Sequence, residues 1–480
     1  MSPARAVQLP SSGVDEPTWA SAHERLVTSL RDLIRIRSIN PPDPPGGELE
    51  AARYLADALG EAGVPAAVHE SVPGRGSVTA RLRGDGTGGE PLLLLSHLDV
   101  VPAPPDRWTH DPFGAEVEEG WIYGRGAVDM KDLVAMELEV VRLLAAEARA
   151  AGRDPASDPI PGLTRDVLFA STADEETGGF AGAAWLAMEH SETLRAAAAI
   201  NEAGAVAVYA GGRRLYPIQV AEKGITAYRL TFHGTWGHGS MPRADNAAIL
   251  VAEAIARLSV PLPARLTTVT SAFLEGAIAA TDGDVARLLR AVATGGERAS
   301  TAALAQVCLP IYGRALDAML RDTISPNVVH AGVKFNVIPG EATLEIDVRR
   351  LPGSDERAME GRIRDLLGPE LAAVTDVELV IASEPLVADY ADPAGLYPVL
   401  ADVVRGHDPD GTPLPVMAPF GTDAKHLLDL GVPVFGFSPL RQPPEETYLE
   451  RWHGVDERVS VAGLRWGLPV LYDAVRRFCG

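Results

Sequence analysis

Residues 91–132 read PLLLLSHLDVVPAPPDRWTHDPFGAEVEEGWIYGRGAVDMKD. The stretch opens with four consecutive leucines, 92–95, a pattern typical of a strand that is buried on both faces and has parallel neighbours. His97 and Asp99 follow at the carboxyl end of this run, and residues two apart on a strand project to the same side. Open α/β sheets build their sites at this edge. The stretch therefore predicts a functional site where the strand leaves the sheet.

Asp129 adds a second acidic group to the predicted site. It follows a turn that contains Gly124 and Gly126, and it opens an amphipathic helical run. A carboxylate can bridge two cations, and the ring of His97 can bind one of them. Asp99 suits a supporting position, in which it accepts the other ring N–H of His97 and sets the tautomer. A lone His-x-Asp pair is more often an ordinary satisfied polar pair, so these residues alone leave both interpretations open.

The composition is that of an ordinary globular protein. The 480 residues suffice for two or three domains with a large core. The net charge of -22 argues against nucleic acid or an anionic membrane as a partner. Cys308 and Cys479 are far apart and indicate neither a disulfide framework nor a thiolate metal site. Neither a secretory apolar core nor a run of transmembrane length is found, so we expect a cytoplasmic protein.

Further acidic residues follow two later apolar runs. The run 167–170 ends in STADEETGG, which places Glu175 and Glu176 where another strand leaves the sheet. The run 196–200 ends in NEAG, which places Glu202 at a third strand exit. Adjacent acids more often mark a solvated turn or a helix start, and a single Glu before Ala-Gly is a weak signal. If they are functional, adjacent carboxylates can divide the work, one binding metal and the other acting as a base.

The order of elements predicts an α/β fold with a mostly parallel sheet flanked by helices. From Lys223 onward the order becomes β-α-β-β-α-β, which predicts an inserted ferredoxin-like α+β domain. An extra helical insert falls within that domain's range. The expected parts are a disordered lead-in (1–18), the main domain (19–216 and 384–480), the inserted domain (217–383) and the helical insert (about 259–326).

These motifs, taken in order, resemble the signature of one family of co-catalytic zinc amidohydrolases. The family contains acetylornithine deacetylase, succinyl-diaminopimelate desuccinylase, aminoacylase, glutamate carboxypeptidase and the yeast-type carboxypeptidase S. The matching pieces are SHLDVVP, WTHDPF, GRGAVDMKD, DEE, NEAG, GHGSMP and HGVDE. The resemblance implies a catalytic domain with two metal ions and an inserted domain that serves as a lid and dimerisation surface. The carboxypeptidase S and aminoacylase branches carry extra length where the helical insert falls.

The resemblance implies a ligand set for each metal ion. One ion is assigned to His97, Asp129 and Glu202. The other is assigned to Asp129, Glu176 and His453. Imidazole and carboxylate ligands suit zinc, with cobalt or manganese as alternatives. A lone histidine near a C-terminal helix is more often a surface residue, but His453 stands in the last motif of the expected order.

Roles in catalysis also follow from the resemblance. Glu175 is expected to act as general base on a water that bridges the two metals, with Asp99 in support. His238 is expected to stabilise the oxyanion. Asn327 and Arg349 are expected to hold the substrate carboxylate, although a surface ion pair is the alternative for Arg349. In dimeric relatives the counterpart of His238 reaches the neighbouring subunit's site, so we expect a homodimer with shared sites.

The expected function is hydrolysis of the amide bond in an N-acyl amino acid or a small peptide that bears a free carboxylate. A carboxypeptidase or dipeptidase is the alternative to a deacylase, because both attack the same type of bond. A non-catalytic metal-binding scaffold is a remote alternative, since no ligand or base is missing. Asp132 stands where the family commonly has glycine, and Trp236 and Trp452 flank His238 and His453. These departures concern substrate choice.

Overall fold

Strand β3 (Leu92–His97) lies in the middle of the main sheet. Its leucines alternate between two hydrophobic clusters, with Leu94 in one and Leu95 in the other, as the two-residue period of a strand requires when both faces are covered. β3 pairs in parallel with β6 (Val167–Thr172) on one side and with β7 (Ala198–Asn201) on the other. The prediction of a doubly buried parallel strand is confirmed.

The computed structural model describes residues 14–41, 47–295, 302–303 and 310–480. Most of the expected disordered lead-in lies outside these residues, as does Cys308, and the first helix already begins at Glu16. Within the described ranges, no helix combines the length and the apolar character needed to cross a membrane.

The main sheet has ten strands in the order β1-β2-β6-β3-β7-β18-β9-β16, with β8 and β17 also paired to β9. Its inner strands β6, β3, β7 and β18 run parallel, which confirms the predicted α/β class. The periodicity had not indicated β9 and β17, which contain prolines that remove a ladder donor. The other strands are β1 (Ala66–Val72), β2 (Arg75–Leu82), β8 (Val208–Ala210), β9 (Arg213–Glu222), β16 (Leu386–Val387), β17 (Gly411–Ala418) and β18 (Val434–Gly436).

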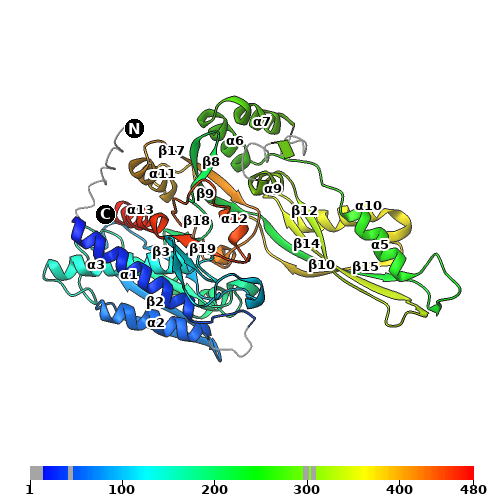
Figure 1. Ribbon diagram of the computed structural model, residues 1–480, viewed down its shortest axis with the longest axis horizontal. Helices are drawn as coiled ribbons and strands as arrows, with labels where there is room; N and C mark the ends of the chain where they lie inside the picture. The colour runs from blue at the N-terminus through cyan, green and yellow to red at the C-terminus, as the bar shows by residue number, and fades with distance from the viewer. Residues whose placement is uncertain (1–13, 42–46, 296–301, 304–309) are drawn as a thin grey trace.

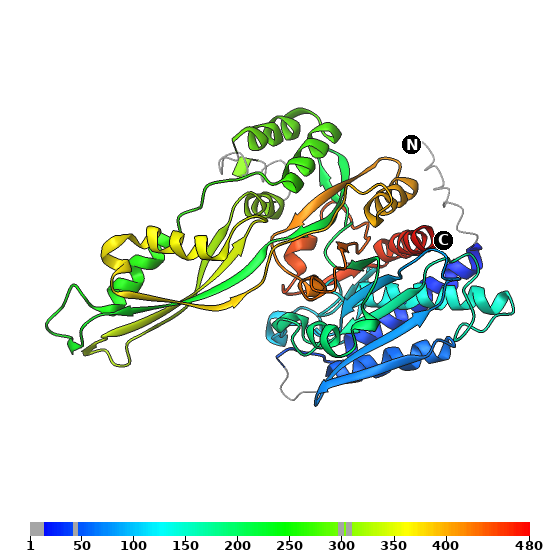
Figure 2. The same cartoon turned by 180° about the vertical axis from the view of Figure 1, so that it is seen from behind.

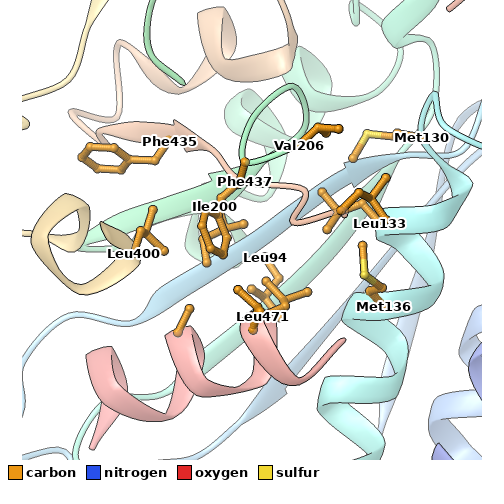
Figure 3. Close-up of a cluster of buried hydrophobic side chains, with 14 of the residues drawn as sticks. Leu94, Met130, Leu133, Met136, Ile200, Val206, Leu400, Phe435, Phe437 and Leu471 are labelled. Atoms are coloured by element: carbon orange, nitrogen blue, oxygen red, sulfur yellow. The ribbon is translucent and has the colours of Figure 1, made fainter. Parts of the chain in front are cut away.

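Helices cover both faces of this sheet (Figures 1 and 2). The larger cluster is drawn from α1, α2, α3, α11 and α13, whereas α4 and the 3-10 helix η4 supply the cluster on the opposite face. Figure 3 shows side chains from the start of α3 beside Leu94 of the sheet and Leu471 of α13. The bounds are α1 (Glu16–Arg35), α2 (Gly47–Glu61), α3 (Lys131–Ala150), α4 (Ala183–Glu189), η4 (Asp423–Leu427), α11 (Leu396–His407) and α13 (Val461–Cys479).

A second sheet belongs to the inserted domain, which we call the lid; it is elongated and projects from the main domain (Figure 1). Its four antiparallel strands lie in the order β12-β14-β10-β15. Helices α5 and α10 cover one face and share a separate hydrophobic core with the sheet, so the predicted ferredoxin-like arrangement is confirmed. The bounds are β10 (Gly224–His233), α5 (Ala247–Leu258), β12 (Thr323–Ala331), β14 (Glu341–Arg350), α10 (Glu356–Ala372) and β15 (Thr375–Ala382).

The helical insert packs against the main domain, although it falls within the lid's range of the sequence. It includes α6 (Thr268–Ala280), α7 (Gly283–Gly295) and α9 (Pro310–Met319). Their buried side chains, such as Leu274 and Leu289, belong to the larger cluster of the main domain. In Figure 1 these helices lie beside β8 and β17, and α6 contacts β17.

We predict that Leu94→Ala lowers the free energy of unfolding by about 2–5 kcal/mol, because it removes buried methyl groups and leaves a cavity in the central sheet. The Leu94 side chain is fully buried. Urea denaturation followed by circular dichroism measures the change. Met188→Ala is the control: that side chain is 72% exposed, so its variant should stay within about 0.5 kcal/mol of wild type. Equal unfolding of all three proteins would contradict the prediction.

Candidate active site

Asp129 lies between two histidines that come from opposite ends of the chain. One carboxylate oxygen, Oδ1, is 3.2 Å from His97 Nε2. The other oxygen, Oδ2, is 3.2 Å from His453 Nε2. A single carboxylate thus faces two imidazoles, which is the arrangement that a bridging ligand requires.

The second ring nitrogen of His97, Nδ1, contacts Asp99, and this contact orients the ring. His97 Nδ1 is 3.0 Å from the backbone oxygen of Asp99 and 3.4 Å from its Oδ1 atom. A carbonyl oxygen can only accept, so Nδ1 donates to it and the ring is turned with Nε2 facing Asp129. The sequence had suggested the carboxylate of Asp99 as this acceptor, but the shorter contact is made by the main chain.

The Asp99 carboxylate instead holds the chain that carries the two glutamates. Its Oδ1 accepts a hydrogen bond from the backbone N–H of Glu175 at 3.1 Å, and its Oδ2 accepts from Glu176 at 3.0 Å. Asn40 donates a third hydrogen bond to Oδ2 at 2.7 Å. This short segment is the 3-10 helix η2 (Glu175–Thr177), which follows β6. Asp99 therefore fixes the backbone from which both glutamates project.

The remaining carboxylates complete two groups of donors. Glu176 Oε2 is 3.0 Å from His453 Nε2, and Glu202 Oε2 is 3.8 Å from His97 Nε2. These contacts bring Glu202 beside His97 and Glu176 beside His453, around the shared Asp129. Potential ligand atoms of His97, Asp129 and Glu176 lie within 4.8 Å of one another, as do those of His97, Glu175 and Glu202.

Burial and neighbouring charges shift the pKa values of the side chains in this cluster. Burial, reinforced by Glu202, raises the pKa of Glu175 well above its ordinary value, and burial raises the pKa of Glu176 to about 7. Burial would also raise the pKa of Asp129, but hydrogen bonds from the two histidines outweigh it and lower that pKa. Asp129 and Glu176 raise the pKa of His453 to about 10. The excess of buried acids fits the binding of divalent cations, which would offset their charge.

Glu457 holds the loop that presents Asp129. Its carboxylate is fully buried and accepts hydrogen bonds from the backbone N–H groups of Gly126 (3.0 Å), Val128 (2.8 Å) and Asp129 (3.2 Å). Arg125 donates to the same carboxylate at 2.5 Å. The sequence reasoning gave Glu457 no role. Its only sequence signal is its place in the HGVDE motif, four residues after His453.

A small sheet pairs two segments that are distant in the sequence, next to the loop that contains Asp129. Strand β19 (Arg458–Ser460) pairs with β5 (Trp121–Tyr123), which pairs with β4 (Val117–Glu118). The pairing places the HGVDE segment beside the loop that contains Asp129. Only tertiary structure makes this contact, because β5 and β19 are separated by most of the sequence.

Other supporting residues had no signal in the sequence. Glu48 accepts hydrogen bonds from the backbone N–H of Asp174 at 3.1 Å and from Arg75 at 2.5 Å. Lys425 Nζ lies 3.7 Å from Glu175 Oε1. A single charged residue in a helix or turn is usually solvated. Nothing in the neighbouring sequence distinguishes Glu48, Arg75 and Lys425 from other charged residues.

Three residues expected to act on the substrate lie on the lid, with Arg349 at its inner end opposite Ile225 and His238 beyond the outer end of β10. Arg349 is paired with Asp347 at 2.7 and 2.9 Å, and the exposed Asn327 accepts from Ser325 at 2.7 Å. His238 is exposed on β11 (Gly237–His238), which pairs with β13 (Val337–Ile338) beyond the outer end of β10.

The length of β10 sets the distance of His238 from the main domain. That strand has ten residues, so its outer end lies about 30 Å from its inner end. Figure 1 shows the outer end of the lid on the side away from the main sheet. Within one chain, His238 therefore stands far from His97.

The departures from the family pattern occupy three different environments. Asp132 is fully buried in the first turn of α3, and its carboxylate oxygens have no hydrogen-bond partner among the described residues. Burial raises the pKa of this carboxyl well above its ordinary value. Trp236 is 60% exposed. Trp452 packs edge-on against Phe420 and Tyr448, with ring centroids 5.1 and 5.4 Å apart.

Comparisons with known proteins identify the family of the chain. The sequence matches Peptidase family M20/M25/M40 over residues 93–477. N-fatty-acyl-amino acid synthase/hydrolase PM20D1 of Xenopus tropicalis is 25% identical over 454 residues, which cover 91% of this chain and 82% of the relative. Aminoacylase-1 of Sus scrofa is 26% identical over 450 residues, which cover 92% and 93% of the two chains.

A solved structure shares the fold. The M20 family metallo-carboxypeptidase Sso-CP2 from Sulfolobus solfataricus superposes with a TM-score of 0.68 at 18% identity, covering 94% of this chain and 99% of that one. The family match itself runs from the middle of β3 into α13 and so includes every residue of the acidic cluster. The chain therefore belongs to Peptidase family M20/M25/M40 and is a hydrolytic enzyme of the metallopeptidase and amidohydrolase class.

Proposed function

We propose that this enzyme hydrolyses the amide bond of an N-acyl amino acid or a small peptide that carries a free carboxylate, with two divalent cations bound at the acidic cluster. One observation carries the proposal: the two oxygens of Asp129 face His97 and His453, each at 3.2 Å. Two imidazoles that share one carboxylate supply the core of a two-cation site.

The donors divide into two sets around Asp129. His97 and Glu202 would hold one cation, and His453 and Glu176 would hold the other. Oxygen and imidazole donors without thiolates favour zinc, and cobalt and manganese accept the same donors. When bound, the cations supply Lewis-acid polarisation of the amide carbonyl and lower the pKa of a water.

Glu175 is the proposed general base. It takes a proton from the attacking water and returns it to the amine nitrogen that leaves. Its position supports this role, because Asp99 fixes its backbone and Lys425 Nζ lies 3.7 Å from Oε1. Burial raises the pKa of Glu175, so its carboxylate is a stronger proton acceptor than an exposed one.

The lid would supply substrate contacts. The guanidinium of Arg349 would exchange its partner Asp347 for the substrate carboxylate, with Asn327 beside it. We propose that His238 stabilises the oxyanion in the site of a second subunit, since it lies at the outer end of the lid in its own chain. This assigns the enzyme a homodimeric state. A cytoplasmic location stays a prediction.

A carboxypeptidase or dipeptidase remains the alternative to a deacylase, because both reactions break the same bond. The relatives include both types: Aminoacylase-1 is named as an acylase, whereas Sso-CP2, which shares the fold, is named as a carboxypeptidase. A metal-binding scaffold without catalysis is disfavoured, because the described residues include every proposed ligand and the proposed base.

Metal removal should abolish the activity. Dialysis against a strong chelator should remove turnover of N-acyl amino acids and dipeptides, and stoichiometric zinc or cobalt should restore it, because the cluster alone cannot polarise the carbonyl. Elemental analysis should find about two cations per chain in the active protein. Full turnover by a preparation shown to be metal-free would end the proposal.

Glu175→Gln and Asp129→Ala should fail in different ways. Glu175→Gln should lower kcat by at least about 100-fold and keep both cations, because it loses a base and no ligand. Asp129→Ala should lose cations, because it removes an oxygen from each set. Glu192→Gln is the matched control, since that side chain is 74% exposed. Loss of metal from Glu175→Gln would show that the roles of Glu175 and Glu176 are assigned wrongly.

Subunit mixing tests the action of His238 across a dimer. Glu175→Ala and His238→Ala should each be inactive, and random exchange makes about half of the dimers mixed. If His238 acts in the partner's site, each mixed dimer has one intact site, so activity recovers to about a quarter of wild type. No recovery, despite exchange shown by differently tagged subunits, would mean that each chain completes its own site.

A further inference from the structure

The ammonium group of Lys425 lies beside the proposed general base, and not all of its donors are used. Lys425 Nζ donates one hydrogen bond, to the backbone oxygen of Thr422 at 3.0 Å. Glu175 Oε1 is 3.7 Å from Nζ, which is longer than a hydrogen bond between charged groups. An ammonium has three N–H donors. Two of them therefore have no acceptor among the residues that the structure describes and are left for solvent or a ligand.

Three strand ends of the main sheet anchor η4, the 3-10 helix that carries this ammonium. The hydroxyl of Thr422, at the start of η4, donates to Glu222 of β9 at 2.6 Å and accepts from Asn201 of β7 at 3.0 Å. Asp423, the first residue of η4, accepts from Thr172 of β6 at 2.7 Å. All five of these side chains are buried. The ammonium is thus brought to a fixed position at the carboxyl edge of the sheet.

The ammonium keeps its charge in this position. Burial would lower the pKa of Lys425, but the carboxylates of Glu175, Asp423 and Glu222 outweigh it and raise that pKa. The side chains of Lys425 and Glu175 each keep 12% of their surface exposed. A charged donor therefore stands at an opening next to the proposed base.

The inner end of the lid lies against the loop that leads into η4. A Cβ atom on Gly421 would lie 2.8 Å from Ile225 Cδ1 of β10, so the two residues are in close contact. Ile225 is directly opposite Arg349 in the pairing of β10 with β14, and opposite side chains lie on the same face of a sheet. Arg349 of the lid is therefore close to the loop that carries Lys425.

We propose that Lys425 binds the free carboxylate of the substrate from the main domain and so selects substrates that carry one. The inference rests on the proposed function and adds a specificity-determining residue to it. Arg349 is already paired with Asp347 through two hydrogen bonds, at 2.7 and 2.9 Å. Lys425 has no carboxylate at hydrogen-bond distance to give up. Its compact ammonium can accept the substrate's charge without such an exchange.

The spacing in the site suits an amino acid. The carboxylate carbon of the leaving amino acid is one residue of chain from the scissile carbonyl carbon, which is about 3.5 Å. With that carbonyl beside the water at Glu175, the carboxylate would fall within reach of Lys425 Nζ, which is 3.7 Å from Glu175 Oε1. The alternative role for Lys425 is an ion pair that only orients Glu175. Such a pair would serve every amide, whereas a carboxylate contact serves only substrates with that charge.

Two substrates that differ only in the carboxylate separate these roles. N-acetyl-leucine and N-acetyl-leucinamide contain the same scissile bond, and alanyl-leucine and alanyl-leucinamide form a second pair. Wild type should prefer the acid by at least about tenfold in kcat/KM, because a hydrogen bond between charged groups contributes about that factor or more. Lys425→Met should lower the value for the acid at least about tenfold and change that for the carboxamide less than about threefold. Lys425→Arg keeps the charge and should keep a preference for the acid.

The control is Arg287→Met, which also removes one positive charge. Its side chain is 66% exposed, so this variant should match wild type with both substrates. Elemental analysis should find the same metal content in every variant, because Lys425 is no ligand. Lys425→Gln replaces Lys425→Met if the latter does not fold.

Titration without turnover measures the contact directly. Zinc-loaded Glu175→Gln should bind N-acetyl-leucine at least about tenfold more tightly than N-acetyl-leucinamide by isothermal titration calorimetry. Adding Lys425→Met should bring the two affinities to within about threefold of each other.

The outcomes keep the inference apart from the proposed function. Equal loss of both activities in Lys425→Met, or no preference for the acid in wild type, would overturn the inference. A preference that Arg349→Met abolishes and Lys425→Met keeps would assign the carboxylate to the lid alone and overturn it as well. Absence of turnover with every N-acyl amino acid and dipeptide would instead overturn the proposed function. The titration would then still decide whether Lys425 binds a carboxylate.

Discussion

The carboxylate of Asp129, held between His97 and His453, is the contact on which the rest of the site depends. Each of its oxygens is committed to a different imidazole, so a small rotation would lose one of them. Glu457 prevents that rotation by binding the backbone N–H groups around Asp129. A buried carboxylate is thereby used to fix the position of another. Such an arrangement is stable only because every oxygen of Glu457 finds donors.

A buried carboxylate also fixes the positions of the two adjacent glutamates, Glu175 and Glu176. Asp99 accepts one backbone N–H from Glu175 and one from Glu176, so the short 3-10 helix is anchored before its side chains are placed. Neighbouring side chains on such a turn point in different directions. Glu176 meets His453, whereas Glu175 lies near His97, Glu202 and Lys425. The backbone geometry thus separates the proposed ligand Glu176 from the proposed base Glu175, which the sequence places side by side.

Three parts of the molecule contribute different physical properties around one sheet edge. The catalytic domain gathers buried acids and imidazoles where β3, β6 and β7 end. The insert adds an apolar wall and shares the core of the catalytic domain. The lid has its own core and carries exposed polar residues on a long arm. The acidic cluster and the apolar wall thus share one hydrophobic core, whereas the lid packs around a core of its own.

The sequence by itself determined the features that are local. The leucine run of β3, the β-α-β-β-α-β order of the lid and the acids at strand exits all follow from periodicity within short segments. The ligand candidates were found because several of them stand in short motifs of fixed order. Periodicity did not predict strands β9 and β17, because their prolines disrupt the usual strand pattern.

Only the tertiary structure decided which distant atoms meet. Glu457 reaches the Asp129 loop through the pairing of β19 with β5, and Glu48 reaches Asp174 across the N-terminal half. The sequence likewise did not show that the insert packs against the catalytic domain and not against the lid, because its apolar residues are compatible with either core. Local patterns specify which face of an element is apolar. The partner of that face is chosen by the packing of the whole chain, which no short segment contains.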